Sequence, residues 1–242
     1  MKIVAILPAR FGSTRFPGKP LAQICGKPMI QYVYETASSA KGIDDCFVAT
    51  DDKRIVDAVV SFGGKAILTG EFSCGSDRVE WASRNIDCDV IINVQGDEPL
   101  IKKEMIEGLV QAFADPNVQM ATLRKRIDKE DEINNPNVVK VITDINGDAI
   151  YFSRFSIPFC RDHKNKNKLS IYKHIGIYAY RKDFLSKYVG LKKSYLEQME
   201  SLEQLRVLEN GYKIRVMETN YETIGVDTPE QLKEIEVLLN AK

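Results

Sequence analysis

Hydrophobic positions in the first hundred residues change between two spacings. Four short apolar runs, at residues 3–8, 46–50, 65–68 and 89–94, are typical of strands buried on both faces of a parallel sheet. Between the first two runs, apolar residues recur at helical spacing at Met29, Ile30, Val33 and Ala37, and Gly42 follows as a stop. Strands that alternate with helices predict an α/β fold with a parallel, doubly wound sheet, in which ligands bind at the carboxyl ends of the strands.

Two later helices are indicated by their first residues. Asp51 or Asp52 is expected to cap a helix whose apolar face carries Ile55, Val56, Val59 and Val60. Thr228-Pro229 is expected to start the last helix, with proline at its first position.

The middle of the chain has a different pattern. Residues 120–127, 138–143 and 149–153 are predicted to be strands, the last two joined by a turn at 145–148. Ser194 and Glu197 form a capping box for one helix that would end near Gly211 and would carry Leu196, Met199, Leu202, Leu205 and Leu208 at helical spacing. No repeat or linker interrupts the chain, so we expect a single domain over 1–242 with a β-rich excursion after about residue 118.

Composition excludes several classes of protein. The chain has 34 basic and 34 acidic residues, a balance that argues against a general nucleic-acid-binding protein. Its five cysteines include no CxxC pair, so neither a disulfide framework nor a zinc site is expected. No apolar run approaches the roughly 18 residues of a membrane span, and the first run is too short for a signal peptide. We therefore expect a cytoplasmic protein that does not enter the membrane.

Charge is distributed unevenly at the start of the chain. The first 34 residues hold five cations and no acid, where about five acids would match the chain average. Three of these cations, Arg10, Arg15 and Lys19, lie in a loop with Gly12 and Gly18, directly after the first predicted strand. The loop matches neither a dinucleotide fingerprint nor a Walker P-loop. Its guanidinium and ammonium groups predict a phosphate site, the alternative being a solvated turn paired with distant acids.

Carboxylates follow two other predicted elements. Asp97 and Glu98 come directly after the strand at 89–94, and neighbouring residues of an extended chain point in opposite directions, so we expect one of them to face the ligand. One or two carboxylates beside phosphates suit Mg²⁺. Asp227 would be the second, although its place before a helix also fits a simple capping role.

A polar face is expected on the segment 174–180. Alternation places His174, Gly176, Tyr178 and Tyr180 on one side and Ile175, Ile177 and Ala179 on the other. An imidazole and a phenol separated by a glycine suit a polyhydroxylated ligand, or else form a structural contact. Arg154, after the strand at 149–153, could hold a carboxylate or make a surface ion pair.

Taken together, these segments resemble the 3-deoxy-D-manno-octulosonate (Kdo) cytidylyltransferases. The matching stretches run in one order from residue 7 to 232: LPARFGSTRFPGKPL, GKPMI, VATDD, NVQGDEP, MATL, NPNVVKV, YFSR, HIGIYAY, LEQLRVLENG and GVDTPEQL. The first stretch and QGDEP are shared with related sugar nucleotidyltransferases, whereas HIGIYAY, LEQLR and GVDTPE are more specific to the Kdo branch.

The resemblance implies a Rossmann-like nucleotide-diphospho-sugar transferase fold, with a mostly parallel sheet and a smaller β-rich region for sugar binding and dimerisation. The nucleotide part would comprise about residues 1–118 and 211–242, and the sugar-binding and dimerisation part about 119–210. The implied reaction is CTP plus Kdo giving CMP-Kdo and pyrophosphate, with Mg²⁺, for lipopolysaccharide synthesis by a homodimer.

The resemblance also implies roles for individual residues. The triphosphate loop would be Arg10, Arg15 and Lys19, the metal ligands Asp97 and Asp227, and the rest of the nucleotide pocket Pro8, Ala9, Arg78 and Gln95. Of these, Arg10, Lys19, Asp97 and Asp227 would be catalytic. The sugar would be bound by Arg154, His174, Tyr178, Glu203 and Gln204.

One position departs from the family pattern, and three other functions remain open. Cys74 replaces the usual serine of a Ser-Gly-Thr-[Asp/Glu]-Arg motif, and a thiol is a weaker hydrogen-bond partner than a hydroxyl. The sugar could instead be 8-amino-3,8-dideoxy-octulosonate or sialic acid. A non-catalytic nucleotide- or phosphate-binding module is the remaining alternative.

Overall fold

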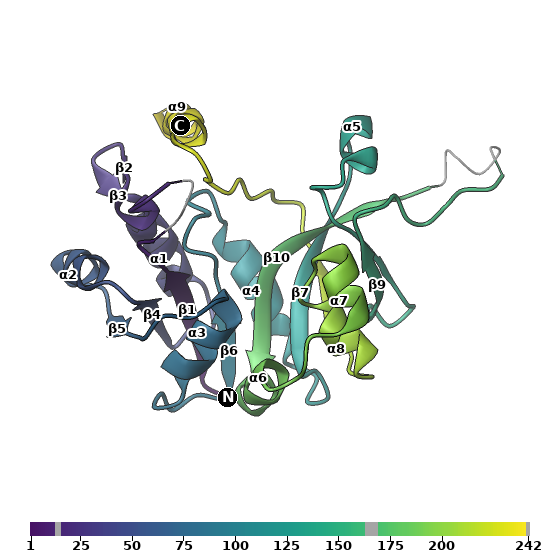
Figure 1. Ribbon diagram of the computed structural model, residues 1–242, viewed down its shortest axis with the longest axis horizontal. Helices are drawn as coiled ribbons and strands as arrows, with labels where there is room; N and C mark the ends of the chain where they lie inside the picture. Colours follow the sequence, from purple (N-terminus) through teal and green to yellow (C-terminus); the bar gives the residue numbers. More distant parts are fainter. Residues whose placement is uncertain (13–15, 163–168, 241–242) are drawn as a thin grey trace.

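The four predicted apolar strands form the parallel core of a sheet. In the computed structural model, which describes residues 1–12, 16–162 and 169–240, they are β1 (Ile3–Ala9), β4 (Asp45–Thr50), β5 (Ala66–Leu68) and β6 (Val90–Asn93). β4 and β6 flank β1, and β5 pairs with β4, all in parallel. The strands are aliphatic because helices cover both faces of this part of the sheet (Figure 1).

The β-rich half continues the same sheet. β10 (Tyr172–Arg181) pairs antiparallel with β6 and with β7 (Met120–Arg126), and β11 (Arg215–Glu218) pairs parallel with β7. The hairpin of β8 (Lys140–Thr143) and β9 (Ala149–Ser153) joins β10 near its amino end. Gly147, at φ +81°, makes the predicted turn of that hairpin. A separate small hairpin pairs β2 (Gln23–Ile24) with β3 (Lys27–Pro28).

Helices cover the two faces of the sheet and bury one hydrophobic cluster on each. One cluster is covered by α1 (Met29–Ser39), α2 (Lys53–Ser61) and α4 (Lys103–Ala112). The other is covered by α3 (Gly75–Ser83), α6 (Lys182–Val189), α7 (Tyr195–Glu200) and α8 (Leu205–Glu209). The remaining helices are the 3-10 turn η1 (Lys19–Leu21), α5 (Glu130–Asn134) and α9 (Pro229–Asn240), and α9 packs against the β2–β3 hairpin. The α/β class and the mostly parallel core are confirmed.

The prediction of one amphipathic helix over residues 194–211 is wrong. Ser194 N–H donates to Glu197 Oε2 at 3.1 Å, as a capping box requires, but the helix ends at Glu200. Ser201 then takes a left-handed conformation (φ +52°), and α8 starts at Leu205. The carbonyls of Glu200 and Ser201 accept hydrogen bonds from the Arg154 guanidinium, and this tertiary contact replaces helical bonding. Met199, expected on the apolar face of the helix, lies within α7 and is exposed.

The apolar face predicted for α2 is narrower than expected. Asp52 caps the helix by accepting from Arg54 N–H, and Ile55 and Val59 are buried. Val60, however, is 61% exposed, because only the stripe at i and i+4 faces the sheet.

Candidate functional site

A cleft of about 370 Å³ lies where β1 and β6 end, beside the start of α3. Of the residues predicted to bind nucleotide, phosphate or metal, the cleft is lined by Pro8, Ala9, Arg10, Lys19, Arg78, Gln95, Asp97 and Asp227. Pro8 and Ala9 end β1, and residues 95–97 follow β6, so the carboxyl ends of two adjacent parallel strands supply half of this set. Arg15 lies outside the described residues.

Gly96 allows the two strand ends to approach each other. A Cβ atom at this position would lie 3.0 Å from the Pro8 carbonyl oxygen and 3.0 Å from Ile30 Cδ1. Neither the backbone of β1 nor the buried Ile30 can move far, so a side chain here would displace Gln95 or Asp97 from the cleft.

Lys19 lies between the two carboxylates that the sequence predicts as metal ligands. Its Nζ atom is 2.6 Å from Asp97 Oδ2 and 3.3 Å from Asp227 Oδ1. Gly18, at φ +71°, turns the chain into η1 and so points Lys19 at these acids. Lys19 belongs to the first 34 residues, which contain no acid, and it therefore pairs with two acids that are distant in the sequence.

A backbone hydrogen bond next to Asp227 holds this residue at the cleft, and other side chains cap the helix that follows it. The N–H of Val226 donates to the Asp97 carbonyl oxygen at 2.9 Å, which joins the two aspartate loops. At the start of α9, Gln231 Oε1 accepts the N–H groups of Asp227 and Thr228, and Thr228 Oγ1 accepts that of Gln231. Thr228 and Gln231 thus cap the helix, and the Asp227 carboxylate faces Lys19.

Two carboxylates suit a magnesium ion that is also held by phosphates. The described residues include no group of three or more metal-binding side chains, as a site built from protein alone would need. Mg²⁺ usually takes one or two carboxylates and completes its shell with phosphate oxygens and water. The hard oxygen donors of Asp97 and Asp227, beside the cations Arg10 and Lys19, fit that pattern.

Glu98 points away from the cleft, as the alternation of neighbouring residues predicts. It does not line the cleft, and burial together with the nearby Asp97 charge raises its pKa to about 7. Of the two carboxylates of this segment, only that of Asp97 therefore lines the cleft.

Arg78 is held in place at the other end of the cleft. The residue is 3% exposed, and its guanidinium donates to Thr69 Oγ1 at 2.6 Å and to Asp51 Oδ2 at 2.7 Å. Phe72, whose ring centroid is 5.8 Å from the Arg78 guanidinium carbon, also lines the cleft. Sequence reasoning missed Thr69 and Phe72 and considered Asp51 only as a cap. A buried arginine requires an acidic partner. A search for the acid that pairs with Arg78 could therefore have singled out Asp51.

Cys74 lines the same end of the cleft and occupies the N-cap position directly before α3. Burial raises the pKa of its thiol to about 12, so the side chain is a neutral thiol at physiological pH. It makes no side-chain capping bond to α3, a role for which serine is better suited.

His174 and Tyr178 lie on the face of β10 that the sequence predicts. His174 Nε2 is 2.9 Å from Thr122 Oγ1, and the ring packs between Phe152 (centroids 5.0 Å apart) and Tyr178 (5.4 Å). Burial lowers the pKa of His174 to about 3, so the imidazole is neutral. Between the two rings, a Cβ atom built on Gly176 would meet no atom within 4 Å, which leaves the space expected there.

Glu203 and Gln204 precede α8 on the same face of the sheet. Glu203 Oε2 is 3.3 Å from Ser76 Oγ of α3 and 3.4 Å from the Tyr188 hydroxyl of α6. Gln204 is 4% exposed, and its Nε2 has no hydrogen-bond partner among the described residues. These two residues therefore lie between the nucleotide cleft and the β-rich half.

Arg154 is bound by backbone carbonyl groups. It donates from Nε to the Glu200 oxygen, from Nη1 to the Pro136 oxygen and from Nη2 to the Ser201 oxygen. Lys140, which is fully buried, donates to the Arg154 carbonyl at 2.9 Å and so fixes the same segment. Arg154 is thus held rigidly at the end of β9, and the surface ion pair considered as its alternative role is not observed among the described residues.

Comparison with known proteins identifies the family. A family model described as "Cytidylyltransferase" matches residues 4–214. A 3-deoxy-manno-octulosonate cytidylyltransferase of Thermodesulfovibrio yellowstonii is 52% identical and covers 99% of both chains. One from Geobacter sulfurreducens is 49% identical over 97% of this chain and 98% of its own. The chain belongs to the 3-deoxy-manno-octulosonate cytidylyltransferases.

Solved structures agree with this family. A structure described as CMP:2-keto-3-deoxy-manno-octonic acid synthetase complexed with CTP has a TM-score of 0.95 at 45% identity, covering 100% of this chain and 99% of its own. The 4-diphosphocytidyl-2C-methyl-D-erythritol synthase of Anaerococcus prevotii shares only the fold, with a TM-score of 0.65 at 16% identity over 99% of this chain and 96% of its own. As a cytidylyltransferase, the protein is a nucleotidyltransferase with the α/β fold expected from its sequence.

Among the described residues, no helix has both the length and the apolar character needed to cross a bilayer.

Proposed function

We propose that this cytidylyltransferase transfers CMP from CTP to the anomeric hydroxyl of Kdo, giving CMP-Kdo and pyrophosphate for lipopolysaccharide synthesis. The observation that carries the proposal is the contact of Lys19 with Asp97 and Asp227, inside a cleft that also contains the other described residues expected to bind the nucleotide. The names and high identities of the relatives support Kdo as the sugar.

The chain's own residues would bind and orient the two substrates. Arg10, Arg15 and Lys19 bind the β- and γ-phosphates and stabilise the leaving pyrophosphate. The anomeric oxygen forms a bond to the α-phosphorus, the bond from that phosphorus to the α–β bridging oxygen breaks, and the hydroxyl proton passes to solvent. Most of the catalysis is positioning and charge neutralisation, because no side chain forms a covalent intermediate.

Asp97 and Asp227 would hold magnesium. When bound, the ion supplies positive charge to the phosphate oxygens and lowers the pKa of the attacking hydroxyl. In the protein alone, the Lys19 ammonium offsets the repulsion between the two carboxylates and keeps them close together.

The sugar would lie against the face of β10. Arg154 has two further N–H groups, one on each Nη atom, beyond those bound to carbonyl groups of the described residues, and these suit a carboxylate. His174, Tyr178, Glu203 and Gln204 offer hydrogen bonds to the sugar hydroxyls, with His174 as a neutral imidazole.

Pyrophosphate release tests the proposal. The protein is assayed with CTP and Mg²⁺ and, in turn, with Kdo, 8-amino-3,8-dideoxy-octulosonate and N-acetylneuraminate. We expect the highest kcat/KM with Kdo and no turnover once EDTA removes the metal. A higher kcat/KM with another sugar would assign that sugar instead. CTP binding without pyrophosphate release from any sugar would favour the non-catalytic nucleotide-binding module.

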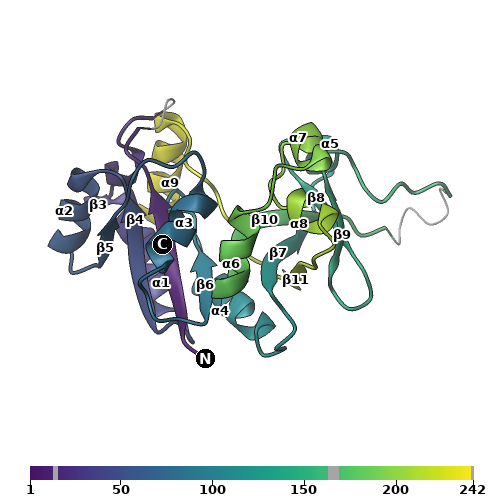
Figure 2. The same ribbon diagram turned by 60° about the horizontal axis from the view of Figure 1, so that its bottom comes forward.

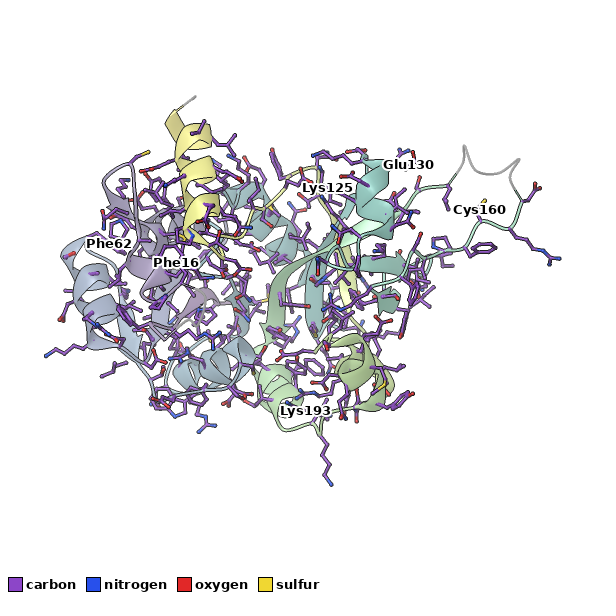
Figure 3. All side chains as sticks on the ribbon, turned by 45° about the horizontal axis from the view of Figure 1, so that its top comes forward. Phe16, Phe62, Lys125, Glu130, Cys160 and Lys193 are labelled. Carbon is purple, nitrogen blue, oxygen red and sulfur yellow. The ribbon has the colours of Figure 1, made fainter. Side chains whose placement is uncertain are left out.

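We also propose that the protein is a homodimer that associates through its β-rich half. Large hydrophobic side chains are exposed along this half, at Ile145, Ile150, Phe155, Phe159, Tyr195 and Met199. Phe155 and Phe159 lie on a segment after β9 that extends away from the rest of the molecule (Figures 1 and 2). Cys160, on the same segment, is at its outer part (Figure 3). Exposed aromatic residues of this kind are typical of a protein interface. The cytoplasmic location and the division into two parts stay predictions.

A further inference from the structure

An asparagine interrupts the aliphatic sequence of β6. The strand reads Val90-Ile91-Ile92-Asn93, and Asn93 is only 2% exposed. Its Oδ1 atom has no hydrogen-bond partner among the described residues. A buried acceptor without a partner costs free energy, and an aliphatic residue would suit this strand better. A functional explanation is therefore needed for this side chain.

The sheet register shows which face Asn93 occupies. In β6, Val90 and Ile92 belong to the cluster under α1 and α4, whereas Ile91 belongs to the one under α3 and α6. Side chains alternate along a strand, so Asn93 shares the face of Ile91. Its neighbours across the sheet are Ile6 in β1 and Tyr178 in β10.

A second buried polar group without a partner lies on the same face. Gln204 Nε2 has none among the described residues, and the adjacent Glu203 reaches Ser76 of α3 at 3.3 Å. Asn93 offers an acceptor and Gln204 a donor, and Tyr178 and the space above Gly176 are on the same face. These are the groups that a ligand carrying several hydroxyls would satisfy.

Asn93 also lies next to the nucleotide cleft along the chain. Gln95, two residues further along, lines the cleft, and Asp97 follows it. We infer that Asn93 is a specificity-determining residue that accepts a hydrogen bond, through Oδ1, from a hydroxyl of the acceptor sugar. The inference rests on the proposed function and adds a residue from the central strand to those expected to bind the sugar.

Kinetics of the variant Asn93→Leu test this role. The substitution keeps the approximate volume and removes the acceptor. We expect the KM for Kdo to rise about tenfold or more, the KM for CTP to stay within about twofold, and the denaturation midpoint to stay equal or rise. The matched control is Ser83→Ala, because Ser83 is also 2% exposed but donates to the Glu80 carbonyl at 2.7 Å. This control should lower stability slightly and leave both KM values unchanged.

Kdo analogues that each lack one hydroxyl identify the contact. For the hydroxyl that Asn93 binds, wild type and variant should use the deoxy analogue with equal kcat/KM, so that the effect of the substitution disappears. If the variant keeps the wild-type KM for Kdo, or if its defect persists with every analogue, the inference is overturned. Asn93→Val serves as a second variant should the leucine fail to fold.

The wild-type control separates the two proposals. Wild-type protein that releases no pyrophosphate with Kdo contradicts the proposed function. Wild-type turnover with Kdo, together with an unaffected Asn93→Leu variant, contradicts only the role of Asn93.

Discussion

Substitution of Asp97 tests what a single carboxylate contributes at the cleft. It is partly exposed and is paired with Lys19, so replacing it should perturb the fold little. We expect Asp97→Asn to reduce turnover by at least about 100-fold and to raise the Mg²⁺ concentration needed for half-maximal rate, because the side chain that we propose as a metal ligand loses its charge. Pyrophosphate release against Mg²⁺ concentration measures both. Asp87→Asn, which alters a carboxylate that is 98% exposed, should behave like wild type. Near-normal turnover of Asp97→Asn at limiting Mg²⁺ contradicts the role.

His174 should make stability depend on pH. Burial lowers its pKa to about 3, below the ordinary 6.5 that it has when unfolded. Between these values the unfolded chain binds the extra proton, so stability is present above pH 6.5 and is lost as the pH falls toward 3. Between pH 6.5 and 5 the loss amounts to about 1.5 kcal/mol. Urea unfolding of His174→Phe, which keeps an aromatic ring against Phe152, should show a loss smaller by this amount. An equal loss in wild type and variant would contradict the neutral state of His174 in the folded protein.

Cys74 offers a test of the one departure from the family pattern. Serine at the start of α3 can accept a backbone N–H of the first turn, so Cys74→Ser should raise the free energy of unfolding by about 0.5–1 kcal/mol. Cys46→Ser is the matched control. Cys46 is 2% exposed in the core, so a hydroxyl there should destabilise the protein. Urea unfolding measures both, and a stability loss in Cys74→Ser would show that the thiol is required for packing.

Individual residues could be predicted from sequence where their position in an element determined their direction. Asp97 follows a strand that ends at the cleft, and the alternation on β10 placed His174 and Tyr178 on the correct face, whereas Gln95 was expected only from the family resemblance. Thr69 was missed because its importance comes from a contact with Arg78, which depends on tertiary structure. Asn93 was missed because its orphaned oxygen becomes visible only when its neighbours are known.

At the scale of elements, the break between α7 and α8 carries a prediction. Ser201 holds a left-handed conformation that a residue other than glycine adopts at a cost. Ser201→Gly should therefore keep or raise the free energy of unfolding, and Ser201→Val should lower it by about 1–2 kcal/mol. Ser38→Gly, in the exposed last turn of α1, should instead lower it by up to about 1 kcal/mol. If urea unfolding shows equal effects of glycine at positions 201 and 38, the left-handed conformation of Ser201 is contradicted.

The same break shows where sequence patterns stop being sufficient. The spacing of leucines from Leu196 to Leu208 fits one helix, and nothing local opposes it. The competing interaction comes from Arg154, which follows the β8–β9 hairpin 46 residues before Glu200 and donates to the carbonyls of Glu200 and Ser201. By contrast, the α/β strands and α9 were predictable because aliphatic runs and a Thr-Pro helix start are local signals.

At the scale of the whole molecule, the exposed hydrophobic residues differ in size and in where they lie. Phe155 and Phe159 are 81% and 87% exposed on the extended segment after β9, whereas Val60 and Val237, at 61% and 69%, lie on helices of the nucleotide part. A single exposed valine on a helix is ordinary, but two exposed phenylalanines on a projecting segment have no intramolecular explanation. They would be buried if the segment packs against a second copy of the chain.

The double variant Phe155→Glu/Phe159→Glu should therefore be monomeric. Placing two carboxylates in an apolar interface opposes association, because each would lose its hydration without gaining a partner. Sedimentation velocity should show a dimer for the wild type and a monomer for this variant, with an unchanged far-UV circular dichroism spectrum. Val60→Glu/Val237→Glu adds the same charge to other exposed hydrophobic residues and should stay dimeric. A dimer that survives in the phenylalanine variant would locate the interface elsewhere, and a wild-type monomer would contradict the dimer itself.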